Sequence, residues 1–124
     1  KNGDIYKVIQ KEHEFFRGFG ELYFSSIKFN KIKGWKLHKK MNMILVVPYG
    51  LVKFVFSKNK HEPFKEISIG SNKKNYKIIS VPSNIWFAFK GYGKPYSLVC
   101  NFSDIIHSPS EVIKCDLSEI PYNW

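Results

Sequence analysis

The chain has 124 residues, and its 20 lysine and arginine residues against 10 aspartate and glutamate residues give a formal net charge of +10 at pH 7. This length predicts a single domain over residues 1–124 and leaves no room for a second. The charge would suit a polyanion, but Arg17 is the only arginine and the lysines are spread over nearly every expected loop. Proteins that read DNA bases rely on arginine, and proteins that bind the phosphate backbone rely on clustered positive charge. A nucleic-acid-binding barrel is therefore only the third hypothesis for this chain.

The cysteines and the hydropathy of the chain further limit the classes of protein to which it could belong. Cys100 and Cys115 are too few and too far apart for a zinc site, and a chain without a secretory segment is expected to keep free thiols in the cytoplasm. No apolar stretch approaches the roughly twenty residues that span a bilayer, so we expect no membrane-spanning segment. The chain begins with Lys1 rather than methionine, which raises the expectation that a native N-terminal strand is missing.

Apolar residues that alternate or run continuously, with turn residues between them, predict a series of short strands. In chain order we expect them at residues 5–9, 21–29, 43–48, 51–57, 64–69, 75–81, 85–90, 96–102 and 112–116. Residues 11–19 fit either a helical turn or a loop with aromatic rings, and residues 108–111 fit one helical turn. Almost no segment has a helical period, so the predicted fold class is all-β, a barrel or jelly roll with minor helix.

The stretch 31–50 joins a basic cluster to an apolar strand. Residues 43–48 are rich in β-branched side chains and end at a Pro-x-Gly turn, which favours a buried strand over a helix. In the extended chain before it, Lys36, His38 and Lys40 occupy alternate positions and should point to one side, with the residues between them on the other. A strand that directs a histidine and two lysines inward would line a site for an anionic ligand.

Candidates for acid–base chemistry are His38, Lys36, His107 and Asp116, since burial or neighbouring cations can lower the pKa of a lysine. The alternative is that His38 is a hydrogen-bonded wall residue and Lys36 a structural ion-pair partner. A metal is not expected, because Lys36 lies two residues before His38 and would repel a cation. Cys100 lies in an apolar strand and is expected to fill the core.

Four motifs occur in a characteristic order: KGW-x-x-H at 33–38, VPYG-x-V-K-F at 47–54, VP-x-x-x-W-x-x-FKG-x-G-KP at 81–95 and H-x-P-x-E…D…IPY-x-W at 107–124. With them the chain resembles, over nearly its whole length, the dTDP-4-dehydrorhamnose 3,5-epimerase family, in particular its short branch similar to spore-coat polysaccharide proteins. The resemblance implies a cupin jelly roll, a homodimer that shares N-terminal strands, no metal or other cofactor, and a pocket for a dTDP-4-keto sugar.

In this family a histidine paired with an aspartate removes a proton next to the 4-keto group, a tyrosine is the acid, and basic residues hold the diphosphate. Lys36 occupies the place of the base, His38 that of a second histidine in the short branch, and Asp116 that of the aspartate. Lys33 matches the phosphate-binding residue before the glycine, and Lys40 is assigned to the diphosphate with it. The family's tyrosine has no clear match.

The resemblance therefore predicts an epimerase-like or isomerase-like protein of surface polysaccharide biosynthesis, with chemistry that is altered or lost. The residues expected at the reacting centre are Lys36, His38, Asp116 and His107. Aromatic side chains at a barrel mouth would stack on the base or sugar, and the candidates are Tyr23, Phe15 and Trp86. The alternative is a non-catalytic cupin that binds a sugar nucleotide or a carbohydrate.

Overall fold

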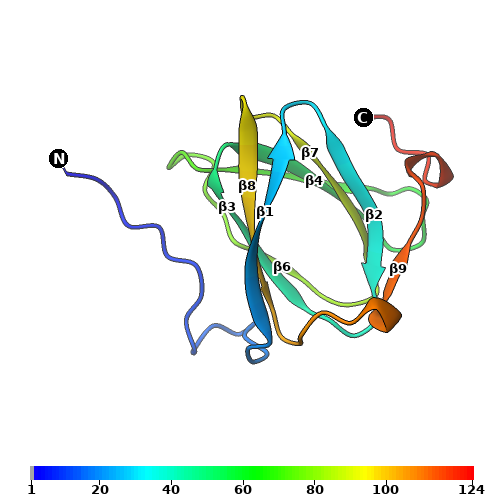
Figure 1. The fold of residues 1–124 in the computed structure, drawn as a ribbon, viewed down its shortest axis with the longest axis horizontal. Helices are drawn as coiled ribbons and strands as arrows, with labels where there is room; N and C mark the ends of the chain where they lie inside the picture. The colour runs from blue at the N-terminus through cyan, green and yellow to red at the C-terminus, as the bar shows by residue number, and fades with distance from the viewer. Residues whose placement is uncertain (1) are drawn as a thin grey trace.

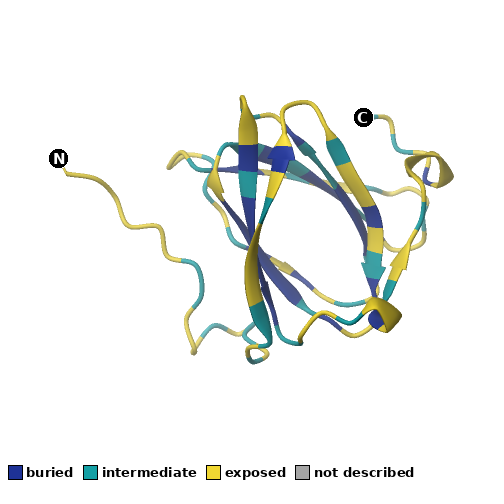
Figure 2. Ribbon diagram, in the orientation of Figure 1, coloured by how far each residue is buried: buried dark blue, intermediate teal, exposed yellow. Residues whose placement is uncertain are grey.

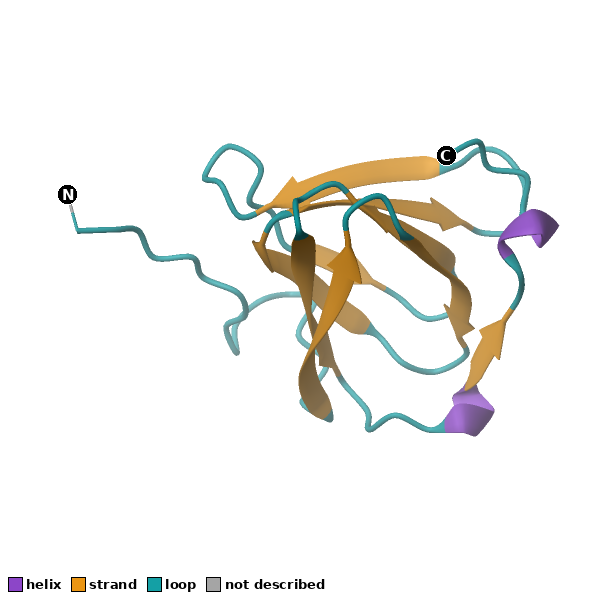
Figure 3. Cartoon of the chain, turned by 45° about the horizontal axis from the view of Figure 1, so that its top comes forward, coloured by secondary structure: helices purple, strands orange, loops and turns teal. Residues whose placement is uncertain are grey.

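The structure, a computed structural model, describes residues 2–124 as two antiparallel sheets that face each other (Figure 1). The strands are β1 (Glu21–Lys28), β2 (Ile32–His38), β3 (Met43–Tyr49), β4 (Leu51–Ser57), β5 (Lys65–Gly70), β6 (Ile79–Val81), β7 (Trp86–Gly91), β8 (Tyr96–Ser103) and β9 (Val112–Lys114). Two 3-10 turns, η1 (Pro109–Glu111) and η2 (Leu117–Glu119), flank β9 at one side of the barrel (Figure 3). The expected all-β jelly roll is confirmed. Within residues 2–124 no helix is long and apolar enough to cross a bilayer.

The first sheet has the strand order β1-β8-β3-β6 and the second has the order β5-β4-β7-β2-β9. Strands adjacent in sequence often lie in opposite sheets, so β1 and β2 face each other across the barrel although a short turn joins them (Figure 1). This arrangement brings the edge strand β1 opposite β2 and β9. A ligand site between these strands therefore draws its residues from both sheets.

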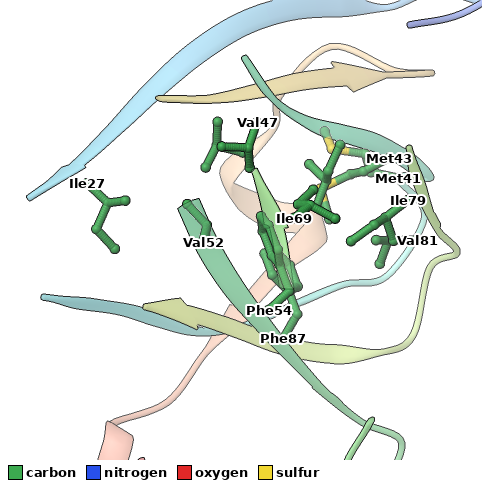
Figure 4. Close-up of a cluster of buried hydrophobic side chains, with 12 residues drawn as sticks. Ile27, Met41, Met43, Val47, Val52, Phe54, Ile69, Ile79, Val81 and Phe87 are labelled. Atoms are coloured by element: carbon green, nitrogen blue, oxygen red, sulfur yellow. The ribbon is translucent and has the colours of Figure 1, made fainter. Parts of the chain in front are cut away.

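The core lies between the sheets, where a cluster of apolar side chains points inward (Figure 4). Fully buried side chains of this kind stabilise the fold by about 1.5–3 kcal/mol each. Along β3, Leu45 and Val47 point into this core while Ile44 and Val46 face the outside of the first sheet, and all four are buried. The continuous apolar run in the sequence thus reflects a strand covered on both faces.

A second cluster covers the outside of the second sheet. Trp35 is completely buried there and packs against Trp86 and Ile120, together with the C-terminal residues Tyr122 and Trp124. The rings of Trp35 and Trp124 lie 5.9 Å apart. The aromatic C-terminal tail therefore closes this face of the sheet.

The N-terminal segment departs from the prediction, because residues 5–9 form no strand. This arm extends away from the barrel in Figure 1 and pairs with neither edge of the first sheet, which ends at β1 and β6. It is held by side chains instead: Tyr6 packs against Tyr76 at 4.9 Å, and the Tyr76 hydroxyl donates to the Lys7 carbonyl oxygen at 2.6 Å. The strand expected at 75–81 is likewise shorter, since only β6 pairs with β3.

Strand β1, expected at residues 21–29, carries apolar side chains on both of its faces. It forms the edge of the first sheet, and its outward side chains Leu22 and Phe24 are 48% and 60% exposed. Figure 2 shows this mixture of exposed and buried positions along the strand.

Candidate active site

A cavity of about 630 Å³ lies between the two sheets, a volume in the range of small-molecule sites. Apolar side chains from the core form much of its wall, and polar side chains from β1, β2, β8, β9 and the loop after β8 converge on it. The polar lining residues are Glu21, Tyr23, Ser25, Lys33, Lys36, His38, Asn101, His107 and Lys114.

Strand β2 delivers two of these side chains through a local irregularity. The register between β2 and β7 shifts between Gly34 and Lys36. Gly34 has φ +142°, and a Cβ atom there would lie 2.4 Å from the Cβ of Ala88, so only glycine fits. Beyond the shift, Lys36 and His38 line the cavity while Trp35 packs on the outer face, which confirms the alternation expected for this strand.

His38 forms a buried pair with Glu111. The two side chains are 7% and 5% exposed, and His38 Nδ1 contacts Glu111 Oε1. The other carboxylate oxygen accepts hydrogen bonds from the main-chain N–H groups of Lys40 at 3.1 Å and Met41 at 3.2 Å. The His38 ring also stacks on Phe87, with ring centres 5.9 Å apart. Both the carboxylate and the imidazole are therefore fixed in orientation.

The environment keeps Glu111 ionised. Burial alone would raise the pKa of Glu111, but the hydrogen bond with His38 and the two main-chain N–H groups outweigh it, so the pKa lies below its ordinary value. A carboxylate at Nδ1 favours a proton on that nitrogen, which leaves Nε2 as a proton acceptor. Since His38 lines the cavity, this arrangement can act as a general base on a ligand held there.

Tyr23 lines the cavity from the first sheet, on the side that faces β2. Its hydroxyl oxygen accepts a hydrogen bond from Asn101 Nδ2 at 3.1 Å. Burial raises the pKa of Tyr23, and the carboxylate of Glu21 raises it further. Because Asn101 occupies an acceptor position of the oxygen, the Tyr23 proton is free to be donated to a ligand.

Three lysines, Lys33, Lys36 and Lys114, form a cationic group in the cavity wall. Lys36 and Lys114 are paired residues of the neighbouring strands β2 and β9. Burial lowers the pKa of Lys36, and the ammonium groups of Lys114 and Lys33 lower it further. Lys33 Nζ reaches across to β1, where it donates to Ser25 Oγ at 3.1 Å and to the Ser26 carbonyl at 2.5 Å. An anionic ligand would relieve the repulsion within this group.

The loop after β8 is anchored at the other end of β1. The main-chain N–H of His107 donates to Glu21 Oε1 at 3.1 Å, and both residues line the cavity. The cavity is thus cationic around Lys33, Lys36 and Lys114, and it carries a carboxylate near Tyr23 and His107.

Five of the nine expected site residues line this cavity, namely Lys33, Lys36, His38, Tyr23 and His107. Asp116 does not join them: it is exposed and caps η2, where its main-chain N–H donates to Glu119 Oε2 at 2.7 Å. The carboxylate paired with a cavity histidine is that of Glu111.

The other three expected residues also lie elsewhere. The Lys40 side chain is exposed beyond the end of β2, and only its main-chain N–H takes part, by binding Glu111. Phe15 belongs to the N-terminal segment and packs beside His13, 4.8 Å between ring centres. Trp86 points to the outer face of the second sheet, where Lys60 Nζ lies 4.8 Å from its ring centre. Side chains at adjacent positions of a strand point to opposite faces of the sheet, which explains why Trp86 lies outside while Phe87 lines the cavity.

Sequence reasoning missed Glu111, Asn101 and Lys114 as site residues. Glu111 is part of the H-x-P-x-E motif, which is a signal for it in the sequence, but the resemblance to the family points to Asp116 instead. Asn101 and Lys114 have only their alternation on β8 and β9 as a signal. Among residues 2–124 no group of three histidine, cysteine, aspartate or glutamate side chains is arranged to hold a metal ion.

The fold of this chain is similar to that of several solved structures. No protein-family model matches the chain, and no curated protein is significantly similar to it. Among solved structures, a dTDP sugar isomerase from Desulfovibrio desulfuricans G20 superposes with a TM-score of 0.89 at 27% identity, over 100% of this chain and 83% of that one. The chain is therefore similar in fold, over its whole length, to dTDP-sugar isomerases and epimerases, the family that its motifs resemble.

Less similar solved structures share the fold. A sugar 3,4-ketoisomerase from Thermoanaerobacterium thermosaccharolyticum, solved with TDP, has a TM-score of 0.67 at 14% identity, over 82% of this chain and 71% of that one. A dTDP-4-dehydrorhamnose 3,5-epimerase from Bacillus anthracis, solved with TDP and PPi, has a TM-score of 0.72 at 17% identity, over 86% and 66%. The expected cupin fold is confirmed by these similarities.

Proposed function

We propose that this protein is an epimerase or isomerase that acts on a dTDP-4-keto sugar by removing a proton next to the ketone. The observation that carries this proposal is that His38 lines the cavity and is paired with the buried carboxylate of Glu111. Tyr23 lines the same cavity from the opposite sheet, so a sugar ring between the sheets would have a proton acceptor on one face and a proton donor on the other.

In the proposed reaction His38 Nε2 takes the proton from the carbon next to the ketone. Glu111 stabilises the imidazolium that forms, because its carboxylate is already ionised and bound to Nδ1. The electrons of the broken C–H bond move onto the carbonyl oxygen, and the positive potential of the cationic group formed by Lys33, Lys36 and Lys114 stabilises this enolate. Tyr23 then donates its proton to carbon on the opposite face, and proton transfer through solvent restores both residues.

Asn101 has a positioning role in this scheme. Its Nδ2 donates to the Tyr23 oxygen at 3.1 Å and would stabilise the tyrosinate left after proton transfer. The same hydrogen bond directs the Tyr23 proton away from Asn101. Asn101 is 7% exposed, so it is held firmly in the cavity wall.

The cationic group would bind the diphosphate. Lys33, Lys36 and Lys114 offer ammonium groups on neighbouring positions of β2 and β9, which suits the several oxygens of a diphosphate. Titration with dTDP, dTDP-glucose and UDP-glucose, followed by thermal unfolding, tests this part of the proposal. A ligand at a hundred times its dissociation constant adds about 2.7 kcal/mol to the free energy of unfolding. Stabilisation by dTDP that Lys33→Gln and Lys114→Gln abolish is the expected result, and no stabilisation by any of the three would refute it.

A non-catalytic sugar-nucleotide-binding cupin is the second candidate. This candidate is favoured by Lys36, because the resemblance places the family's catalytic histidine at this position and the chain has a lysine there. Incubation with dTDP-4-keto-6-deoxyglucose and analysis by proton NMR separate the two. A changed sugar configuration supports the enzyme, whereas saturable binding with an unchanged sugar supports the binding protein.

We further infer a homodimer that serves surface polysaccharide biosynthesis in the cytoplasm. The edge strand β1 exposes Leu22 and Phe24, and Ile5 in the N-terminal arm is 88% exposed. Exposed apolar side chains on an edge strand, as at Leu22 and Phe24, favour a second copy of the chain as their cover. Sedimentation analysis should give a dimer, and Phe24→Glu should give a monomer. A wild-type monomer at micromolar concentration would contradict this inference.

A further inference from the structure

One end of the barrel carries a cluster of exposed lysines and aromatic rings that the proposed function does not use. Three turns meet there: the β1–β2 turn, the β3–β4 turn and the β7–β8 turn. The members of this basic turn cluster are Lys28, Phe29, Lys31, Tyr49, Lys90, Tyr92, Lys94 and Tyr96. Figure 1 shows the β1–β2 and β7–β8 turns together at the upper end of the barrel, and Figure 2 shows them as exposed.

Main-chain hydrogen bonds hold the three turns as one surface. The N–H of Phe29 donates to the Pro95 carbonyl at 3.1 Å, and that of Asn30 donates to the Gly91 carbonyl at 2.8 Å. The N–H of Tyr92 donates to the Leu51 carbonyl at 2.8 Å, which joins the β3–β4 turn to the other two. The cluster is therefore a preformed part of the fold.

The four aromatic rings of the cluster are partly exposed, and two of them lie under lysine ammonium groups. Phe29, Tyr49, Tyr92 and Tyr96 are 40%, 45%, 39% and 40% exposed. Lys94 Nζ lies 4.7 Å from the Phe29 ring centre, Lys90 Nζ lies 5.4 Å from that of Tyr92, and the rings of Tyr49 and Tyr96 lie 5.3 Å apart. Phe29 and Tyr92 thus lie beside a positive charge, and Tyr49 and Tyr96 form a partly exposed aromatic pair next to them.

No acidic side chain balances this charge. The sequence contains no aspartate or glutamate at residues 22–61 or 67–103, which include all three turns. In the part of the chain that the structure describes, none of the four lysines takes part in an ion pair. The acidic groups of the site, Glu21 and Glu111, lie toward the other ends of these strands. This end of the barrel therefore carries positive charge that no acidic residue of the three turns offsets.

We propose that the basic turn cluster docks the protein on an anionic lipid surface. Lysines attract acidic headgroups, and tyrosine and phenylalanine side chains at turn tips insert at the boundary between headgroups and acyl chains. Single-stranded nucleic acid is the competing polyanion, but its binding proteins follow the backbone along a groove with arginine and stacked aromatic rings. Here the charges are all lysines, and they sit on the tips of turns.

Co-sedimentation with vesicles tests this proposal. The wild-type protein should bind vesicles of phosphatidylcholine with one quarter phosphatidylglycerol and should not bind vesicles of phosphatidylcholine alone. Each lysine near an anionic surface strengthens binding by roughly fivefold, so the triple variant Lys28→Gln, Lys31→Gln, Lys94→Gln should weaken it on the order of 100-fold. The matched triple Lys11→Gln, Lys58→Gln, Lys65→Gln removes the same charge from exposed positions elsewhere and should weaken it far less.

Three outcomes would overturn the proposal: absence of binding to acidic vesicles, equal losses in the two triple variants, or a single-stranded oligonucleotide bound through the cluster while vesicles are not. Phe29→Ser should reduce the binding that survives in high salt, where lysine contributions are screened. Thermal unfolding of both triple variants checks that they fold. Affinity for dTDP should be unchanged in the cluster triple, so failure of this proposal is distinguishable from failure of the proposed function.

Discussion

Replacement of Glu111 by glutamine removes the charge from the buried pair and keeps its shape. The carboxylate accepts hydrogen bonds from His38 and from the main-chain N–H groups of Lys40 and Met41. Hydrogen bonds to a charged group contribute about 1.5–3 kcal/mol each, and a glutamine oxygen can retain one or two of the three. We expect Glu111→Gln to lower the free energy of unfolding by about 2–3 kcal/mol near neutral pH and Glu111→Ala, which leaves all three donors unpaired, by about 3–5 kcal/mol.

The lowered pKa of Glu111 adds a pH dependence to this loss. A carboxyl group whose pKa is lower in the folded state than in the unfolded state stabilises the protein above the unfolded value, close to 4.5, and this stability is lost as the pH falls through the folded value. Glutamine does not titrate. The difference in unfolding free energy between the wild type and Glu111→Gln should therefore be constant near neutral pH and should shrink in acid.

Urea unfolding followed by tryptophan fluorescence over a range of acidic pH values measures this difference. Glu12→Gln is the matched control, because Glu12 is exposed, and it should change the unfolding free energy by no more than about 0.5 kcal/mol. A loss below about 1 kcal/mol for Glu111→Gln, or a loss that stays the same in acid, would refute the account of the pair.

Three further predictions follow from the cavity and from β2. Affinity for dTDP should begin to fall in alkaline solution below the ordinary lysine pKa of 10.5, because burial, Lys114 and Lys33 lower the pKa of Lys36. In Lys36→Arg this early fall should vanish in calorimetric titrations, and identical pH profiles of the two proteins would contradict the prediction. In Asn101→Asp the Tyr23 hydroxyl should donate its hydrogen bond to the new carboxylate instead of to a ligand, which should slow turnover by about 100-fold and raise the pKa of Tyr23 further. Unchanged turnover and an unchanged tyrosinate absorbance titration, read against Tyr23→Phe, would argue against the positioning role. Gly34→Ala should cost about 1–3 kcal/mol more stability than Gly18→Ala, since both glycines have positive φ but only Gly34 has a neighbour in the way; equal losses in denaturant melts would mean that Ala88 moves aside.

The strands that sequence reasoning recovered are those with a strong local pattern. Residues 21–29, 51–57 and 96–102 match β1, β4 and β8 to within about one residue. The alternation of Lys36 and His38 against Trp35 was also predictable, because an extended chain fixes the side of each residue. The prediction of a strand at residues 5–9 was wrong, because a strand forms only where a neighbouring strand can pair with it, and the local sequence does not reveal whether such a neighbour exists.

The site was harder to predict because its residues converge from distant parts of the chain. Glu111 reaches His38 across 73 positions and Asn101 reaches Tyr23 across 78. Asp116 and Glu111 are equally acidic and close in sequence, and only the 3-10 turn η1 decides which of them points into the barrel. Trp86 and Phe87 differ by one position and hence by one face of the sheet.

In the proposed reaction His38, oriented by Glu111, removes a proton from the carbon next to the ketone of the bound sugar. Incubation of the protein in heavy water with dTDP-4-keto-6-deoxyglucose, followed by proton NMR of the positions beside the keto group, measures this step directly. The account predicts deuterium incorporation by the wild type, a rate at least about 100-fold lower for His38→Asn and an intermediate rate for Glu111→Gln. Incorporation by His38→Asn at the wild-type rate, or none by a wild-type protein that binds the sugar nucleotide, would contradict it.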